Sequence, residues 1–175
     1  MTNPATSTVK PADPPTGAGL REPRMLGGKF LTFYLSGEEY GIEILKVHEI
    51  IGMMSVTAIP RTPEFIRGVI NLRGKIIPIV DFRLKFGMES KYQTDKTCII
   101  VVHVLGIEMG IIVDRVSEVL NIAAAEVEKA PSFGADVNTD YILGIGKSQG
   151  KVRILLDIDR VLSNSEIIDV DTSRA

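Results

Sequence analysis

Two stretches of this 175-residue chain are each written twice. Adding 69 to the numbers of residues 29–51 gives residues 98–120 without a gap, and adding 76 to residues 65–81 gives residues 141–157. The matched positions carry the same residue at Gly37 and Gly106, Glu39 and Glu108, Gly41 and Gly110, Val47 and Val116, Glu49 and Glu118, Gly68 and Gly144, Gly74 and Gly150, and Asp81 and Asp157. A unit of about 70 residues is too long for a solenoid repeat and suits a small barrel.

A duplication also separates two kinds of residue. Positions on which the copies agree serve the fold, whereas positions that differ are free to serve function. A unit of about 70 residues lies near the lower limit of independent stability, so we expect the two copies to support each other. The net charge of −2 gives no field that would hold a polyanion, which makes nucleic acid a poor candidate partner.

The single cysteine, Cys98, lies in an apolar run and can form no internal disulfide, as expected in a reducing compartment, and we interpret it as a buried strand residue. No apolar run approaches the roughly 18 residues that a membrane span needs, and the N-terminus lacks the apolar core of a signal peptide. We therefore predict a cytoplasmic protein with no direct membrane insertion.

The repeats divide the chain into four parts. Residues 1–28 are rich in proline and poor in large apolar residues, so we expect a flexible tail. Residues 29–92 form the first predicted barrel and residues 93–168 the second, with strands free to exchange between them. Residues 169–175 are a frayed end.

The first half of each unit predicts a hairpin, over 29–35 and 39–44 in one copy and over 98–105 and 107–113 in the other. Residues 45–51 fit neither the helix nor the strand period cleanly; we favour a strand that bends or bulges, with a helical turn as the alternative.

Thr62, followed by Pro63, has the pattern of a helix cap and first helical residue, with Gly68 as the stop, so a short connector helix is predicted here. Residues 69–72 and 75–80 then predict a second hairpin, whose tip needs the positive φ that Gly74 supplies. Gly150 is its counterpart. Asp81 and Asp157 each follow a strand and precede a short apolar and basic segment, which indicates that each caps a helical turn.

The residues that catalysis and metal binding need are few. A hydrolase would have to use His48 or His103, the only histidines, and we interpret both as packing or surface residues. No cysteine or histidine pairs have zinc-site spacing, and no glycine-rich loop fits a phosphate. We predict no catalytic residue, no metal and no cofactor, and hence no enzyme.

The hairpin tips are where the copies disagree most. Residues 71–74 read Asn-Leu-Arg-Gly, whereas residues 147–150 read Lys-Ser-Gln-Gly. Leu72 is an apolar residue at a tip where solvent is expected, and Arg73 offers five donors in a rigid fork, a composition seen where one protein grips another. The alternative is that Leu72 only covers the neighbouring barrel and that Arg73 is solvated.

Residues 47–54 also differ from their counterparts. They end in two methionines, whose flexible side chains can adapt to a partner, whereas the other copy continues into Ile122 and Ala123. We hypothesise a cleft between two like barrels, lined by Val47, Ile50 and Met53 with Arg73 nearby, that would accept an amphipathic helix.

Taken together, these segments resemble the bacterial chemotaxis coupling proteins of the CheW family. The resemblance rests on residues 39–44, 47–51, 59–81, 113–120, 141–145 and 155–159, and its most specific part is the Asn-Leu-Arg-Gly run within a proline-flanked frame. It covers nearly all of residues 29–162.

The resemblance implies an all-β fold of two intertwined five-stranded SH3-like barrels with short connector helices. It also implies a noncatalytic adaptor that joins the regulatory domain of the histidine kinase CheA to the cytoplasmic tip of methyl-accepting chemotaxis receptors, in arrays at the inner face of the membrane. Because that regulatory domain resembles the adaptor, contacts between barrels can close rings, which allows weak self-association. The receptor groove then lies at or near Val47, Glu49 and Arg73.

Two other classes of function stay open on sequence alone. A small barrel can bind nucleic acid through basic grooves and exposed aromatic rings, or can serve as another kind of protein-interaction module. A small hydrolase using one of the two histidines is the third candidate.

Overall fold

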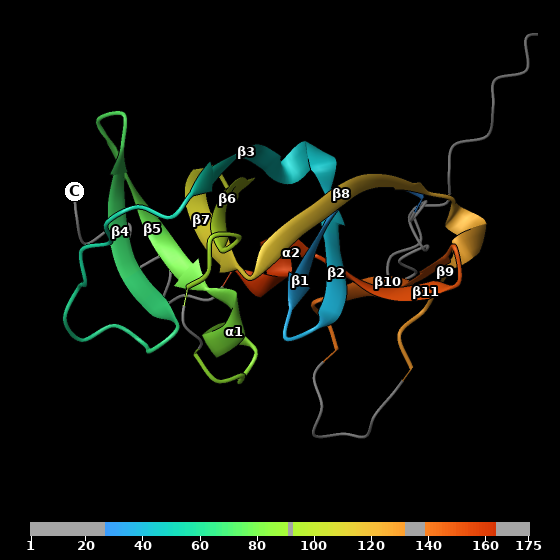
Figure 1. Cartoon of the computed structure of the whole chain (residues 1–175). Coiled ribbons are helices and arrows are strands. Elements are labelled where there is room, and N and C mark those ends of the chain that lie inside the picture. Colours follow the sequence, from blue (N-terminus) through green and yellow to red (C-terminus); the bar gives the residue numbers. More distant parts are fainter. Residues whose placement is uncertain (1–26, 91–92, 132–138, 164–175) are drawn as a thin grey trace, which may run out of the picture.

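The structure, a computed structural model, describes residues 27–90, 93–131 and 139–163. The predicted tail (1–28) and the predicted frayed end (169–175) lie almost entirely outside these residues. Strands dominate, and they form two mixed sheets, as the all-β prediction required (Figure 1). The strands are β1 (Gly28–Leu35), β2 (Glu38–Glu43), β3 (Val47–Gly52), β4 (Ile66–Leu72), β5 (Lys75–Asp81), β6 (Cys98–Val104), β7 (Ile107–Val113), β8 (Arg115–Ile122), β9 (Val127–Glu128), β10 (Ile142–Ser148) and β11 (Lys151–Leu156).

Each sequence copy contributes strands to both sheets. The six-stranded sheet has the order β8-β1-β2-β11-β10-β9, and the five-stranded sheet has the order β3-β6-β7-β5-β4. The first hairpin of each copy thus joins the later strands of the other copy, through the parallel pairs β2–β11 and β5–β7. The division at residues 92 and 93 marks the sequence repeats; as a division into domains it stays a prediction.

The five-stranded sheet curls until its two edges meet. Beyond β3, Thr57 pairs with Val69 of β4 through two backbone hydrogen bonds of 2.9 Å each. Gly68 allows this approach: its φ is +136°, and a Cβ built there would lie 1.9 Å from the carbonyl oxygen of Thr57. A glycine is therefore required at this position, where the two edges close.

Both predicted second hairpins are present. Arg73 and Gly74 have φ angles of +53° and +88°, and Gln149 and Gly150 have φ angles of +55° and +74°. Two successive positive φ angles define the type I′ turn, which matches the twist of the flanking strands. In the first tip, the side-chain oxygen of Asn71 accepts a 2.8 Å hydrogen bond from the amide of Gly74, which fixes the turn.

The connector helix predicted from Thr62 to Gly68 is wrong. The hydroxyl of Thr62 donates to the carbonyl of Ile59 (2.9 Å) instead of capping a helix, and β4 begins at Ile66 after a turn in which the Ile66 amide donates to the carbonyl of Pro63 (3.0 Å). The short helices lie elsewhere. They are η1 (Ile44–Lys46), α1 (Phe82–Lys85), η2 (Ala124–Glu126) and α2 (Ile158–Val161).

Both alternatives for residues 45–51 are realised in succession. The chain makes the single helical turn η1 and then enters β3, whose pairing with β6 has a bulge between Val47 and Glu49. This segment carries the chain from the six-stranded sheet to the five-stranded sheet.

The two aspartate caps are confirmed. A side-chain oxygen of Asp81 accepts hydrogen bonds from the amides of Arg83 (2.9 Å) and Leu84 (3.3 Å) at the start of α1. Asp157 accepts one from the amide of Arg160 (3.3 Å) at the start of α2.

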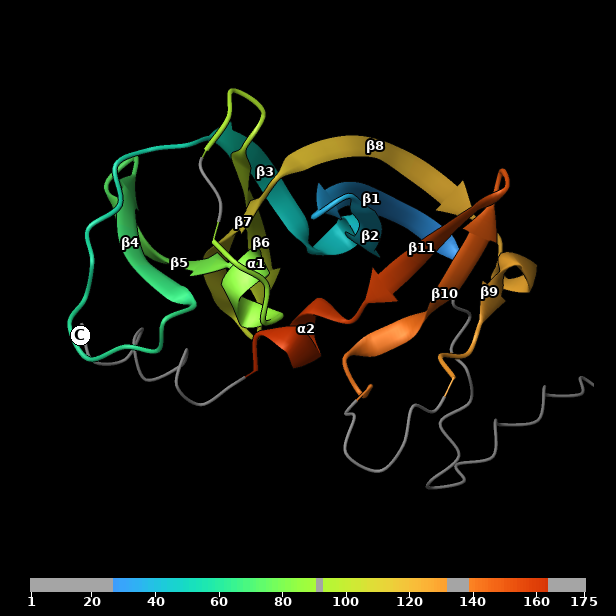
Figure 2. The ribbon, with the colours of Figure 1, turned by 60° about the horizontal axis from the view of Figure 1, so that its bottom comes forward.

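One large hydrophobic core joins the two sheets. Figure 2 shows α1 and α2 between β4 and β5 on one side and β10 and β11 on the other. The core contains residues of β1 and β2 as well as residues of β6 and β7, together with side chains of α1 and α2. Among its members are Leu31, Phe33, Ile42, Phe82, Ile100, Val102, Met109, Ile111, Leu156 and Leu162. A smaller cluster lies within each sheet. The copies therefore share their main core, as the small size of each unit led us to expect.

Candidate partner-binding site

The candidate site is built on β3, at the edge of the five-stranded sheet. Side chains alternate along this strand between a half-buried face and an exposed face, as the two-residue period of a strand requires. Val47 and Glu49 are half-buried, whereas His48 and Ile50 are exposed. The predicted groove residues therefore do not share one face of the strand.

An ion pair connects β3 to the tip of the β4–β5 hairpin. The Nη2 atom of Arg73 donates to Oε1 of Glu49, and Nε2 of His48 lies 3.7 Å from the same oxygen. The side chain of Arg73 is 67% exposed and that of Glu49 is 26% exposed. Arg73 thus lies on the surface and not in the core, and the structure brings together two predicted site residues that are 24 positions apart in the chain.

Two apolar side chains extend the surface of β3. Ile50 is 45% exposed and Met54 is 38% exposed. Met53, the predicted groove residue, is half-buried and packs against the core cluster of the five-stranded sheet. Val47 likewise packs against the main core. The pliable methionine that a partner could reach is therefore Met54.

Leu72 is almost fully buried. It is 9% exposed and belongs to the core cluster of the five-stranded sheet, with Ile70, Ile77 and Ile79. The interpretation that Leu72 covers the barrel is correct, and the one that places it in solvent is wrong, because residues at a strand end keep the alternation of the strand even next to a turn. As a receptor groove, the set Val47, Glu49, Ile50, Met53, Leu72 and Arg73 stays a prediction.

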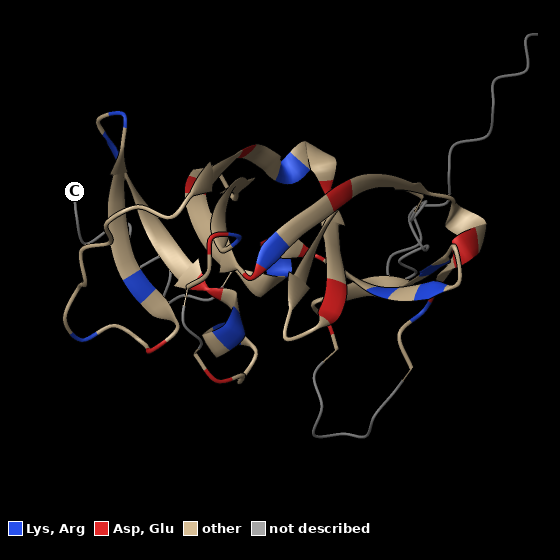
Figure 3. Cartoon of the chain, in the orientation of Figure 1, with Lys and Arg blue, Asp and Glu red and all other residues tan. Residues whose placement is uncertain are grey.

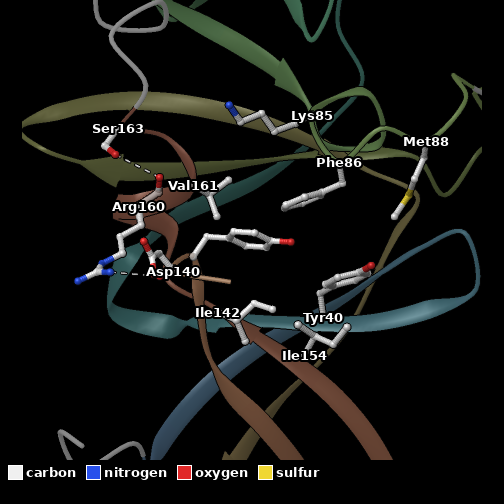
Figure 4. A pocket seen from close by; sticks show the side chains of 11 residues that line it. Tyr40, Lys85, Phe86, Met88, Asp140, Ile142, Ile154, Arg160, Val161 and Ser163 are labelled. Atoms are coloured by element: carbon white, nitrogen blue, oxygen red, sulfur yellow. Dashed lines mark hydrogen bonds between the residues drawn. The ribbon is translucent and has the colours of Figure 1, made fainter. Parts of the chain in front are cut away.

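A cavity of about 660 Å³ lies elsewhere, between α1 on one side and β10, β11 and α2 on the other (Figure 4). Its wall is a row of rings: Tyr40 stacks on Phe86 at 6.1 Å between centroids, and Phe86 lies 5.6 Å from Tyr141. Burial raises the pKa of Tyr40, and Glu38 and Tyr141 add to the effect. A crevice between parts of both copies therefore exists, but its lining includes none of the predicted groove residues.

The described residues contain no group of three or more His, Cys, Asp or Glu side chains placed to hold a metal ion. His103 is exposed on β6. Cys98 is half-buried at the start of β6, and burial raises the pKa of its thiol, with a backbone hydrogen bond at Val116 acting the other way. None of these groups forms part of the candidate site.

Sequence reasoning missed a buried ion pair in the six-stranded sheet. Nε of Arg153 lies 3.0 Å from Oε2 of Glu39, and the two side chains are 1% and 5% exposed. Neither atom has a well-aligned hydrogen bond, so the contact is an ion pair held by proximity. The signal was present in the repeat, because adding 76 to Ile77, an apolar position in a strand, gives Arg153.

Among the helices in the described ranges, none has the length and apolar character that a membrane span requires.

Comparison with known proteins agrees with this architecture. The family model described as "CheW-like domain" matches residues 29–166. "Chemotaxis protein CheW" of Klebsiella aerogenes is 44% identical over 83% of this chain and 88% of its own length. "Chemotaxis protein CheW" of Bacillus subtilis is 34% identical over 78% of this chain and 87% of its own length. The crystal structure of "scaffolding protein TtCheW" from Thermoanaerobacter tengcongensis superposes with a TM-score of 0.72 at 38% identity, covering 81% of this chain and 96% of the other.

Two β-sheets that exchange hairpins around a shared core, with the edge strand β3 tied to a hairpin tip by an ion pair, define a small two-sheet protein of the all-β class. The chain belongs to the CheW-like domain family. Its relatives are chemotaxis proteins and a scaffolding protein, which supports a coupling protein of chemotaxis.

Proposed function

We propose that this chain is a noncatalytic adaptor that couples methyl-accepting chemotaxis receptors to the histidine kinase CheA. Membership of the CheW-like family supports the proposal, and so does the similarity to the Thermoanaerobacter relative, which is named a scaffolding protein. The adaptor holds a receptor tip and the regulatory domain of the kinase in a fixed relation, so that a receptor shift changes kinase activity through unequal contacts in the two receptor states. It acts in the cytoplasm, is recruited to receptor arrays at the membrane, and needs no cofactor or metal.

The observation that carries the proposal is the ion pair between Glu49 and Arg73. An exposed pair of this kind contributes only about 0–1 kcal/mol to stability, so stability gives little reason for it. What it does is hold a guanidinium, 67% exposed, at the edge strand β3. Ile50 and Met54 supply adaptable apolar contact, and Arg73 supplies directional donors, which is the composition of an anchor for a helical partner.

The alternative of a nucleic-acid reader finds no support in the side chains. Every Phe and Tyr in the described part of the chain is buried or half-buried, so these rings form no platform on which bases could stack.

The proposal predicts that Arg73→Glu abolishes receptor control of the kinase in reconstituted arrays, because it places two carboxylates in contact and removes the donor fork. The matched control is Gln149→Glu at the equivalent tip, which we expect to leave kinase control unchanged. Both variants should unfold within about 0.5 kcal/mol of the parent, because both tips are exposed. Normal control by Arg73→Glu, or equal loss in both variants, would contradict the proposal.

A charge swap separates two roles for the pair. Glu49→Arg combined with Arg73→Glu restores the ion pair and reverses its direction. If the pair only orders the edge of the sheet, the swap restores receptor control. If Arg73 itself contacts the receptor, as proposed, control stays lost in the double variant.

A further inference from the structure

A second cavity, of about 170 Å³, lies beside α1 and the loop that precedes β6. It is lined by residues of β4, β5, α1, β7 and β8 and by residues 93–97. Its lining consists of Arg67, Asp81, Arg83, Gln93, Thr94, Lys96, Thr97, Ile112, Asp114 and Arg115. Figure 3 shows basic segments on α1 and at the start of β8. None of these residues belongs to the candidate partner-binding site.

The cavity has more positive charge than negative charge. Four of its lining residues are cationic and two are carboxylates. Both carboxylates are already saturated. Asp81 accepts hydrogen bonds from the amides of Arg83 (2.9 Å) and Leu84 (3.3 Å) and from Nη1 of Arg67 (3.1 Å). Asp114 accepts hydrogen bonds from Nε (2.6 Å) and Nη2 (2.5 Å) of Arg83 and from the amide of Ser36 (2.9 Å).

Three guanidinium groups are fixed before any ligand arrives. Arg83 is held by the two-pronged contact with Asp114 and is 11% exposed in its side chain, and Asp114 raises its pKa further. Arg67 is held by Asp81. Arg115 lies over the ring of Tyr34, 4.0 Å from its centroid. Fixed donors lose little entropy on binding, which favours affinity for a group that matches their geometry.

The remaining cation and the hydroxyls come from one compact loop. The amide of Thr94 donates to the hydroxyl of Thr97 (3.0 Å), and the amide of Lys96 donates to the hydroxyl of Thr94 (3.1 Å). Within the part of the chain that the structure describes, neither Lys96 nor Arg115 has a carboxylate partner at ion-pair distance. These two cations are therefore available to a ligand.

The other copy of the repeat shows that the fold does not need this charge. The residues equivalent to Arg67, Arg83 and Arg115 are Leu143, Asp159 and Lys46. There the aspartate pairs with the lysine at 2.7 Å, so the equivalent place has no excess of positive charge. A cluster of cations that only one copy has is better explained by a ligand than by packing.

From this geometry we propose that the cavity binds a single phosphoryl group, as inorganic phosphate or as a phosphomonoester. Two cations in excess of the carboxylates match a dianion, and guanidinium forks match the oxygens of a tetrahedral anion. The volume equals about six waters at roughly 30 Å³ each, which is enough for one phosphoryl group. This site goes beyond the coupling function and does not rest on it.

The test measures binding to the full chain by titration calorimetry with inorganic phosphate, O-phospho-L-serine and acetate. We expect saturable one-to-one binding of inorganic phosphate and none of acetate. Binding of phosphoserine as well would show that the site takes a phosphorylated side chain, and its absence would restrict the site to the free ion. Binding should weaken at least tenfold in Arg115→Gln and in Lys96→Gln. Lys151→Gln, at an exposed lysine of β11, should bind as the parent does.

Two further variants keep the result interpretable. Arg115→Lys copies the residue of the other half and should retain most of the affinity, because the charge is kept. Arg67→Leu copies Leu143 and should weaken binding while the chain stays folded by circular dichroism. Failure of inorganic phosphate to bind, equal binding of acetate, or unchanged affinity in Arg115→Gln would overturn the proposal.

Discussion

Position 153 in the six-stranded sheet and position 77 in the five-stranded sheet are equivalent in the two copies, yet they hold an arginine and an isoleucine. Both side chains are 1% exposed. Ile77 packs in a purely apolar cluster, whereas Arg153 pairs with Glu39 and donates through Nη1 to the carbonyl of Ser148 (3.1 Å). The same framework therefore closes around either an apolar side chain or an ion pair.

The two sheets should therefore lose stability through different kinds of substitution. An apolar core loses stability in proportion to the volume removed, whereas a buried ion pair fails when one charge is left without the other. The apolar cluster of the six-stranded sheet is small, with Phe30, Ile122 and Leu155 as its buried members. Outside the shared core, the sheet thus relies more on the paired charges than on apolar packing.

The largest expected effect comes from breaking that pair. Arg153→Ala leaves the carboxylate of Glu39 buried without its cation, with the Tyr34 hydroxyl (3.2 Å) as its remaining donor, and should lower the free energy of unfolding by about 3–5 kcal/mol, measured by urea denaturation. Ile77→Val, a matched change in the other sheet, should cost only about 0.5–1.5 kcal/mol. A loss below about 1 kcal/mol in Arg153→Ala would show that the pair is not needed.

Replacing both partners tests the same comparison from the other side. Arg153→Met with Glu39→Leu gives the six-stranded sheet an apolar interior like that of its partner. Most of the loss should be recovered, because no charge is left buried. Recovery of none of it would mean that the loss in the single variant arises from packing and not from the unpaired carboxylate.

Acid should weaken the six-stranded sheet through the same carboxylate. Burial acts to raise the pKa of Glu39, but the favourable interactions of its carboxylate with Arg153, Thr32 and Tyr34 outweigh burial and hold the pKa below its ordinary value. In the unfolded chain this carboxylate has the ordinary glutamate pKa of about 4.3. In the folded chain it takes up the proton only at lower pH. The stability that the ionised group contributes above the unfolded pKa is therefore lost as the pH falls through the folded pKa.

Glu39→Gln should remove this part of the acid sensitivity. Urea denaturation between pH 5.5 and 3 would give the slope of the unfolding free energy against pH for the parent and for the variant. A single proton can make these two slopes differ by at most about 1.4 kcal/mol per pH unit. Parallel slopes in parent and variant would refute the assignment to Glu39.

The smallest expected effects come from the two aspartate caps. Asp81→Ala should cost about 1–2 kcal/mol, because Asp81 accepts from two amides and also pairs with Arg67. Asp157→Ala should cost about 0.5–1 kcal/mol, because its hydrogen bond from the Arg160 amide (3.3 Å) and its ion pair with the Arg160 side chain (3.5 Å) are longer than the contacts of Asp81 with the Arg83 amide and with Arg67. Thermal unfolding would measure both, and a larger loss at Asp157 would reverse the ranking.

Much of the fold could be predicted from the repeat. The hairpins, the positive-φ tips at Gly74 and Gly150, and the aspartate caps follow from local chemistry that both copies share. The pairing of the strands could not be predicted, because parallel contacts such as β2 with β11 leave no mark within either segment. The connector helix at Thr62 failed for a related reason: a distant partner of β4, at Thr57, decided the local conformation.

The candidate site was predictable in part. The exposed guanidinium of Arg73 and its closeness to β3 followed from the contrast between copies. The burial of Leu72 did not, because the direction of its side chain depends on the register of β4 and not on its place next to the turn. The contrast would also have revealed Arg153, since an arginine opposite an isoleucine in an apolar strand calls for a partner charge.

The exchange of hairpins between the copies has a consequence for synthesis on the ribosome. Strand β1 pairs with β8, where Phe30 lies opposite Leu120, and β2 pairs with β11, where Ile42 lies opposite Leu156. Neither pairing can form until the ribosome has synthesised the later strand. At the usual rates of elongation this delay is on the order of ten seconds. For that time the nascent chain carries open strand edges, which are a template for aggregation. Truncated products should therefore be the species that chaperones and proteases handle most.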